Sequence, residues 1–363
     1  MTSKAYANAV DASAQQGGRR NLIINGAMQV AQRGTSVSMS DNSNEGYNTV
    51  DRFYNNIGSA SSIAATVSQS TDAPDGFANS LKYEVTSAIT SFAGTEFSLI
   101  QQRFEGQDLQ HLKYGTSSAQ DLTLSFWVKS NKTGTYVINF INEDNNRMRS
   151  ETYTINDSNT WEYKTITIDG DTVGALDNDN EHSFRFNMWL VAGPTYASGS
   201  LDSSWGSISA GNNAVGQTNL YDTVGNTFQI TGVQLEVGSV ATPFEHRSYG
   251  EELALCQRYF YLFDPSSTTM FPATRFGGGS IGFTLNAPVT MRASPSYSNS
   301  GGSGQFYLRG NGAGEGFDNP NLASFGGNLV NLNKGGLTHN PSGSEAYIVY
   351  ATVNADHYFD AEL

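Results

Sequence analysis

Two tryptophans, Trp127 and Trp189, lie in segments where apolar and polar residues alternate with the two-residue period of a β-strand. The alternation puts each indole on the polar side of its strand, away from the side that would form the core. An indole can stack on the apolar face of a sugar ring while polar neighbours hydrogen-bond the sugar's hydroxyl groups. The candidate glycan-binding residues on these two polar sides are Trp127, Lys129, Arg185, Asn187 and Trp189. The alternative for each indole, and for Trp205, is burial under a loop or against a second subunit, because tryptophan is enriched at interfaces.

The elements that would position these residues are short β-strands separated by turns rich in Gly, Pro, Asn and Asp. The clearest strand candidates lie at 50–57, 81–85, 97–104, 122–128, 136–141, 161–168, 184–191 and 228–237. Residues 35–50 and the Gly- and Ser-rich stretch 193–225 are expected to be loops. With almost no helical periodicity, this pattern predicts an all-β fold whose main domain is a jelly-roll β-sandwich.

The segment Asn226 to Tyr261 divides the chain. The apolar positions of its strand shift by one place after Gly232, which predicts a β-bulge. Ser248 and Glu251 have the spacing of a capping box, which predicts a short helix. We therefore expect an N-terminal helical peptide (1–20), a jelly roll (21–247), a helical joint (248–260) and a smaller β domain (261–363).

Composition narrows the functional class. The net charge is −14 at pH 7, which disfavours binding to nucleic acid because phosphate contacts need clustered Lys and Arg. The single cysteine, Cys256, excludes an internal disulfide and is expected to be a buried, inert thiol. No apolar run approaches the ~18 residues of a membrane helix, so we expect synthesis in the cytoplasm and no membrane insertion.

Motifs for catalysis and for metal binding are scarce. The histidines are dispersed, and the sequence contains no HExxH, GxSxG or P-loop motif. Asp177, Asp179 and Glu181 alternate as in a calcium loop, but His182 and Met188 occupy the places that need Gly and Glu. A solvated turn is expected there, with a different calcium site as the alternative. We expect that the protein is not an enzyme and has no cofactor and no metal ligands. A glycoside hydrolase remains the alternative, because its paired carboxylates leave no local signature in a sequence.

The C-terminal domain carries three further candidates, Tyr297, Tyr307 and Arg309, which we expect on or beside loops at a distal tip. Their alternative role is to fill a thin core. This domain is rich in glycine, so folding costs it much conformational entropy, and its core is expected to be small. Both features favour burial of surface against copies of the same chain.

Three segments resemble virion appendage proteins of tailed bacteriophages, particularly phages of marine bacteria. They are NLIINGAMQVAQRGTS (Asn21 to Ser36), TLSFWVKSNKTGTY (Thr123 to Tyr136) and ITGVQLEVGSVATPFEHRSYGEELALCQRYF (Ile230 to Phe260). The resemblance covers roughly residues 21–261, and its motifs are structural. It implies a carbohydrate-binding jelly roll in a tail fibre, tail spike or head fibre, and a homo-oligomer, since such fibres are typically trimers.

The resemblance also implies where the protein acts and which proteins it contacts. It favours docking of residues 1–20, through Tyr6 and Val10, to phage tail or capsid proteins, over the alternative of a frayed terminus. The expected location is the virion, and the expected function is attachment to a host cell-surface glycan. Two other hypotheses remain: a capsid decoration or tail adaptor protein without a receptor, and a glycan-degrading spike.

Overall fold

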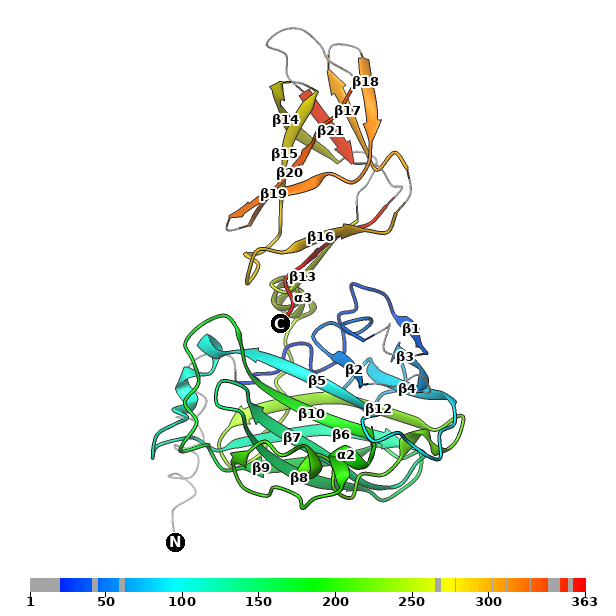
Figure 1. The fold of residues 1–363 in the computed structure, drawn as a ribbon, viewed down its shortest axis with the longest axis vertical. Helices are drawn as coiled ribbons and strands as arrows, with labels where there is room; N and C mark the ends of the chain where they lie inside the picture. Colours follow the sequence, from blue (N-terminus) through cyan, green and yellow to red (C-terminus); the bar gives the residue numbers. More distant parts are fainter. Residues whose placement is uncertain are drawn as a thin grey trace. The chain divides into compact units, whose positions relative to one another are not determined.

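The computed structural model describes residues 20–40, 45–58, 63–264, 269–277, 279–301, 303–310, 313–326, 328–338, 347–351 and 355–363. The chain forms two units, Met1–Arg247 and Ser248–Leu363 (Figure 1). The expected docking residues Tyr6 and Val10 lie outside the described residues. No helix among the described residues is both long enough and apolar enough to cross a membrane.

Unit 1 consists of two antiparallel six-stranded sheets stacked face to face (Figure 1). Sheet A has the order β1 (Ser36–Met39), β3 (Ala64–Ser70), β4 (Ser80–Ser87), β12 (Thr227–Val237), β6 (Leu122–Ser130), β9 (Glu162–Ile168). Sheet B has the order β11 (Gly206–Ser207), β8 (Arg147–Ile155), β7 (Gly134–Asn142), β10 (His182–Ala192), β5 (Phe97–Glu105), β2 (Tyr54–Gly58). The predicted all-β jelly-roll sandwich is confirmed. The expectation of a loop over residues 35–50 is wrong at β1, which pairs with β3.

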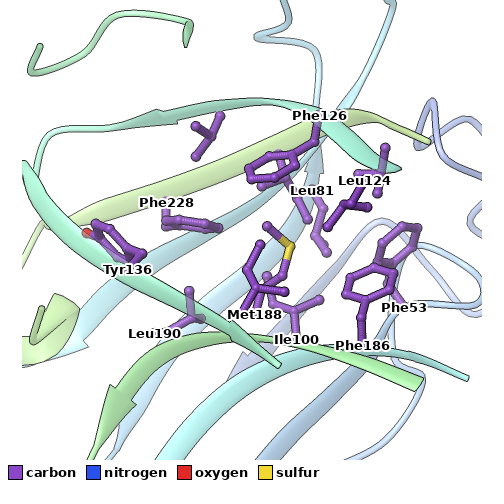
Figure 2. Packing of buried hydrophobic residues seen from close by; sticks show 14 of the residues in the cluster. Phe53, Leu81, Ile100, Leu124, Phe126, Tyr136, Phe186, Met188, Leu190 and Phe228 are labelled. Atoms are coloured by element: carbon purple, nitrogen blue, oxygen red, sulfur yellow. The ribbon is translucent and has the colours of Figure 1, made fainter. Parts of the chain in front are cut away.

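The core of unit 1 is formed by the inward-facing positions of both sheets. Figure 2 shows Leu124, Phe126 and Phe228 of sheet A packed against Ile100, Phe186 and Met188 of sheet B. These side chains are fully or almost fully buried, and burying such groups supplies the main stabilising free energy of a sandwich. The alternation recognised in the sequence therefore sets which side of β6 and of β10 faces outward.

Strand β12 lies at the centre of sheet A, between β4 and β6, and contains the predicted bulge. The register with β6 shifts between Thr231 and Gln234, and Gly232 has a φ of +60°. The N-terminal segment binds the bulged part: the Val233 amide donates to the Gly26 carbonyl at 2.9 Å. An added Cβ at Gly26 would lie 2.1 Å from the Val233 oxygen, so this close approach requires glycine.

Helical segments are few and short. Among the described residues of unit 1 they are η2 (Gly106–Asp108), η3 (Gln110–Leu112), α2 (Pro194–Ala197), η4 (Ala210–Asn212) and η5 (Leu220–Asp222). Helix α3 (Tyr249–Gln257) begins unit 2, and its capping box between Ser248 and Glu251 is present as predicted. Cys256 on this helix is buried, as expected.

Unit 2 contains a small sheet C and a larger sheet D. Sheet C has the order β13 (Phe260–Phe263), β22 (His357–Asp360), β16 (Ser296–Asn299). Sheet D has the order β18 (Ala313–Phe317), β17 (Phe306–Gly310), β21 (Tyr347–Ala351), β14 (Met270–Gly277), β15 (Ser280–Asn286), β20 (Leu329–Lys334), β19 (Asn321–Gly326). The core of this unit is formed by apolar residues such as Phe283, Leu308 and Phe359.

His357 is buried in the core of unit 2. Its ring centroid lies 4.6 Å from that of Phe306 on β17, and its Nδ1 hydrogen-bonds the Tyr297 hydroxyl at 2.8 Å. Its Nε2 is buried without a hydrogen-bond partner among the described residues. Burial lowers the pKa of His357 to about 4, below its ordinary value of 6.5.

We predict that His357 makes unit 2 sensitive to acid. The unfolded chain binds the extra proton between pH 6.5 and about 4, whereas the folded chain does not. The full stability is therefore present above about pH 6.5 and is lost as the pH falls toward 4. Native-state hydrogen exchange at about pH 7 and about pH 5 should show a loss of protection in unit 2.

The substitution His357→Gln, which cannot titrate, should remove most of this acid sensitivity. The matched control is His246→Gln, which changes an exposed histidine in unit 1. Undiminished acid sensitivity of unit 2 in the His357→Gln variant would contradict the prediction.

Candidate functional site

The outward side of sheet A carries aromatic side chains on adjacent strands at its β9 edge. Trp127 of β6 is directly opposite Tyr163 of β9, and their ring centroids are 5.3 Å apart. Trp161 comes just before β9, and the ammonium group of Lys129 lies 5.8 Å from its ring centroid. Trp127 and Trp161 are half-buried, while Tyr163 is 45% exposed. Ring surface is therefore open to solvent along this edge.

A cavity of about 530 Å³ opens above Trp127 and Tyr163. We call it the sheet A hollow. Its aromatic lining consists of Phe77, Trp127, Tyr163, Phe244 and His246. The remaining lining residues are Asp75, Gly76, Ser125, Gly232, Ala241, Thr242 and Pro243. The volume falls in the ~300–1,000 Å³ range typical of small-ligand pockets.

Three rings form the wall that faces Trp127. Phe77 packs edge-on against Phe244 with centroids 5.0 Å apart, and His246 lies 5.4 Å from Phe77 and 4.9 Å from Phe244. The glycine of the β12 bulge makes room for this wall. A Cβ at Gly232 would lie 2.6 Å from Cζ of Phe77 and 3.1 Å from Cδ1 of Trp127.

Buried polar side chains of β12 hold the segment that carries Phe244 and His246. The Glu236 carboxylate, only 2% exposed, accepts from the Thr242 amide at 2.8 Å and from the Thr242 hydroxyl at 2.6 Å. The Gln234 side-chain oxygen accepts from the Glu245 amide at 2.8 Å. Both donors belong to the segment 242–245, so β12 fixes the position of this wall.

Glu245 anchors the same segment to the start of the described chain. Its carboxylate accepts from the backbone amides of Arg20 and Asn21 at 3.2 and 2.9 Å and pairs with Arg247 at 2.8 Å. Burial by itself would raise the pKa of Glu245, but these hydrogen bonds and the guanidinium outweigh burial and lower it. Glu245 therefore remains a charged anchor near neutral pH.

A polar cluster lies one row further along β6. The Asp72 carboxylate accepts from Lys129 at 2.8 Å, from the Gln229 side chain at 3.0 Å and from the Trp161 indole at 3.4 Å. The hydrogen bond from Lys129 is the main reason why the pKa of Asp72 is lowered. Aromatic faces thus lie beside a fixed group of donors and acceptors, the combination that can stack on a sugar ring and bind its hydroxyls.

The structure separates the five predicted glycan-binding residues. Trp127 and Lys129 lie on the outward side of sheet A, but Arg185, Asn187 and Trp189 lie on the outward side of sheet B, because β6 and β10 belong to different sheets. The two groups are therefore on opposite faces of the sandwich and cannot form one site.

Trp189 is not open to a ligand. Its side chain is 2% exposed and forms a small apolar cluster with Leu99, Val137 and Ala214, against which Tyr196 packs. Tyr196 and Ala214 belong to the long 193–225 stretch, so the alternative of burial under a loop is correct for this residue. Its indole donates to the Asn139 side chain. Trp205 is also a packing residue: it lies against Tyr114 at 5.9 Å and donates to the Asp169 carbonyl at 2.7 Å.

Arg185 and Asn187 also interact with the protein itself rather than with open solvent. Arg185 forms an ion pair with Glu143 at 2.7 Å, and Asn187 is 3% exposed. Among the described residues no three His, Cys, Asp or Glu side chains gather closely enough to hold a metal ion. In the Asp177–Glu181 stretch, the Asp179 carboxylate accepts from the Glu181 amide at 3.0 Å, as in an ordinary turn.

The three candidates in unit 2 lie on two short strands. Tyr307 and Arg309 are exposed on β17 of sheet D. Tyr297 is on β16 of sheet C, where it is half-buried and bonded to His357. Tyr297 is therefore on a different sheet from Tyr307 and Arg309. Its ring packs against the core of unit 2, which is the alternative role given for it in the sequence analysis.

Sequence reasoning missed five residues of the site: Phe77, Trp161, Tyr163, Phe244 and His246. For two of them a signal existed. In WEYKTITI, Trp161 and Tyr163 lie on one side of the strand, and the buried Ile166 and Ile168 lie on the other. The same alternation identified Trp127. The other three come from non-strand segments, whose positions depend on the bulge and on the Glu236 contacts.

No family model matches this chain, and no curated protein matches it. Among solved structures it is similar to the enzymatically active domain of tailspike protein 4 of bacteriophage CBA120, with 15% identity and a TM-score of 0.31 over 60% of this chain and 21% of that chain. It is also similar to a carbohydrate-binding module in complex with β-1,4-galactotriose, with 10% identity and a TM-score of 0.28 over 60% of this chain and 99% of that chain. A third is the family 11 carbohydrate-binding module of a Clostridium thermocellum cellulosomal cellulase, with 11% identity and a TM-score of 0.27 over 56% of this chain and 96% of that chain. The chain spans about a fifth of the length of the tailspike chain.

We predict that Gly232→Ala disturbs the sheet A hollow. The methyl group would push Phe77 away from Trp127, and the positive φ adds backbone strain of about 1 kcal/mol. Urea unfolding should show unit 1 destabilised by about 1–3 kcal/mol. The matched control is Gly225→Ala, which has a φ of +84° and no neighbouring atom within 4 Å of the added Cβ. Equal losses of stability in the two variants would show that contact with Phe77 is unimportant.

Proposed function

We propose that this chain is a glycan-binding protein and that the sheet A hollow is its binding site. The observation that carries the proposal is the open aromatic lining of a cavity of about 530 Å³, with Trp127 at its floor and Tyr163 beside it. Stacking of these rings on a sugar would supply affinity, and the Asp72 cluster would supply directional hydrogen bonds. Because the β12 bulge and the Glu236 contacts fix the walls, little ordering would be needed on binding.

Binding rather than hydrolysis fits the lining of the hollow. Glycoside hydrolases typically use two carboxyl groups, about 5–9.5 Å apart, on either side of the scissile bond. The described lining contains one carboxylate, that of Asp75. The neighbouring Asp72 carboxylate is paired with Lys129 at 2.8 Å, and this hydrogen bond lowers its pKa, whereas a general acid needs a raised pKa. We therefore propose a non-catalytic site. Release of reducing sugar from a polysaccharide that the protein binds would contradict this part of the proposal.

We predict that Trp127→Ala weakens glycan binding at least about tenfold, which corresponds to about 1.4 kcal/mol of binding free energy. Arrays of bacterial surface glycans would identify a ligand, and calorimetry would compare the variants. Tyr249→Ala is the matched control because it removes an aromatic ring that is 57% exposed on α3 of unit 2. Unchanged affinity of the Trp127→Ala variant for every bound glycan would refute the site.

We further propose that the protein acts in the virion of a tailed bacteriophage, where it attaches the particle to a host-surface glycan. The support is the resemblance of the segments at 21–36, 123–136 and 230–260 to virion appendage proteins. Two of these segments contact each other within this chain, because the Val233 amide donates to the Gly26 carbonyl. Residues 1–20 would then dock the chain to tail or capsid proteins.

We predict that a chain without residues 1–19 keeps the wild-type glycan affinity but is not incorporated into virions. This deletion retains Arg20, whose backbone amide donates to the Glu245 carboxylate that anchors the wall of the hollow. Purified particles from a phage that encodes the truncated chain would be assayed by mass spectrometry for the protein. The control is the Trp127→Ala chain, which should be incorporated normally and bind glycan weakly. Normal incorporation of the truncated chain would refute the docking role.

A further inference from the structure

Sheet D of unit 2 has an exposed face that differs from the solvent face of an ordinary antiparallel sheet. Phe283, Leu308 and Val349 lie on the opposite face, in the core, with at most 3% exposure. Antiparallel sheets with one buried face usually turn polar residues to the solvent. On the three neighbouring strands β17, β21 and β14, the outward positions are mostly apolar instead.

The strand pairing places these outward residues in two rows. One row runs Tyr307, Tyr350, Met270, and the next runs Arg309, Ile348, Pro272. Tyr307 is 41%, Ile348 36% and Met270 53% exposed. We call these six residues the sheet D face.

Glycines make this face smooth at its β18 end. Gly314 and Gly316 pair with Arg309 and Tyr307 on β17. A Cβ at Gly314 would lie only 2.4 Å from Cε1 of Tyr307, so the tyrosine ring lies across β18 rather than pointing into solvent. A smooth surface with exposed aromatic and aliphatic groups resembles the core of a protein interface.

The outward side of sheet D also has an unusual charge pattern. The chain has 34 acidic residues and a net charge of −14. Among the described outward side chains of sheet D, none is acidic, and the one cation is Arg309. Two copies of so acidic a chain repel each other over most of their surface, but they can meet at this face without opposing carboxylates.

We propose that the sheet D face binds a second copy of this chain. Tyr, Met and Arg are enriched in interface cores, whereas Asp, Glu and Lys are depleted there, and the sheet D face has this composition. Met270, Pro272 and Ile348 offer no flat ring surface and no hydroxyl or amide group, so half of the face is poorly suited to a sugar. The inference is independent of the sheet A hollow, which belongs to unit 1.

The test measures the mass of the full chain in solution by light scattering over a broad range of concentrations. The wild-type chain should have at least twice the mass of a single chain. The substitution Ile348→Glu places a carboxylate in the middle of the contact and should lower the association constant at least about tenfold, through charge repulsion and desolvation. Arg309→Glu should act in the same direction.

Val240→Glu is the matched control, because it adds the same charge at an apolar side chain of unit 1 that is 71% exposed, and its mass should equal that of the wild type. Circular dichroism would verify the fold of each variant. If Ile348→Glu does not fold, Ile348→Thr takes its place, because it keeps a β-branched residue on the strand. This variant should also have a lower association constant than the wild type.

A wild-type chain that is monomeric at all concentrations overturns the proposal. So does an oligomer whose mass is the same in the wild type and in the Ile348 and Arg309 variants. A monomer that loses glycan binding on substitution of Tyr307 would also overturn it and would assign the face to a ligand. Loss of self-association with unchanged glycan affinity would support the proposal and leave the sheet A hollow intact.

Discussion

The architecture of unit 1 depends on the β-bulge that interrupts the pairing of strand β12 with β6. At Gly232 the strand bulges, and the backbone then adopts a positive φ that glycine tolerates without a steric penalty. The bulge restores the alternation one place out of phase, so Val233 and Leu235 enter the core while Gln234 and Glu236 turn outward. The backbone of Val233 thereby bonds Gly26 of the N-terminal segment, and the outward side chains anchor the wall of the hollow.

The same strand geometry gives the two outer faces of the sandwich different properties. Sheet B is covered where the 193–225 stretch crosses it, and Trp189 is sealed beneath that stretch with its indole hydrogen-bonded to Asn139. Sheet A is covered only partly, by the segment that ends in Phe244 and His246, and the gap leaves Trp127 and Tyr163 accessible. A tryptophan on the polar side of a strand is therefore open to a ligand only where no segment crosses the sheet above it.

The sequence was sufficient for the features that depend on local order. Period-two alternation identified β6 and β10, the phase shift at Gly232 identified the bulge, and the Ser248 and Glu251 spacing identified the capped helix α3. It was insufficient where distant segments meet. Alternation does not show that β6 and β10 lie in different sheets, nor that Tyr196 and Ala214 cover Trp189. Strand β8 was missed because its sequence, RMRSETYTI, places charged residues at inward positions near the edge of sheet B.

The central claim is that ligands bind over Trp127 rather than over the buried indoles. The most direct measurement is a titration followed by NMR, in which the indole N–H signals of the four tryptophans are assigned and a bound glycan is added. The signals of Trp127 and Trp161 should shift in a saturable manner, while that of Trp189 stays in place. Saturable shifts confined to Trp189, or to amides of unit 2, with an unchanged Trp127 signal, would contradict the central claim.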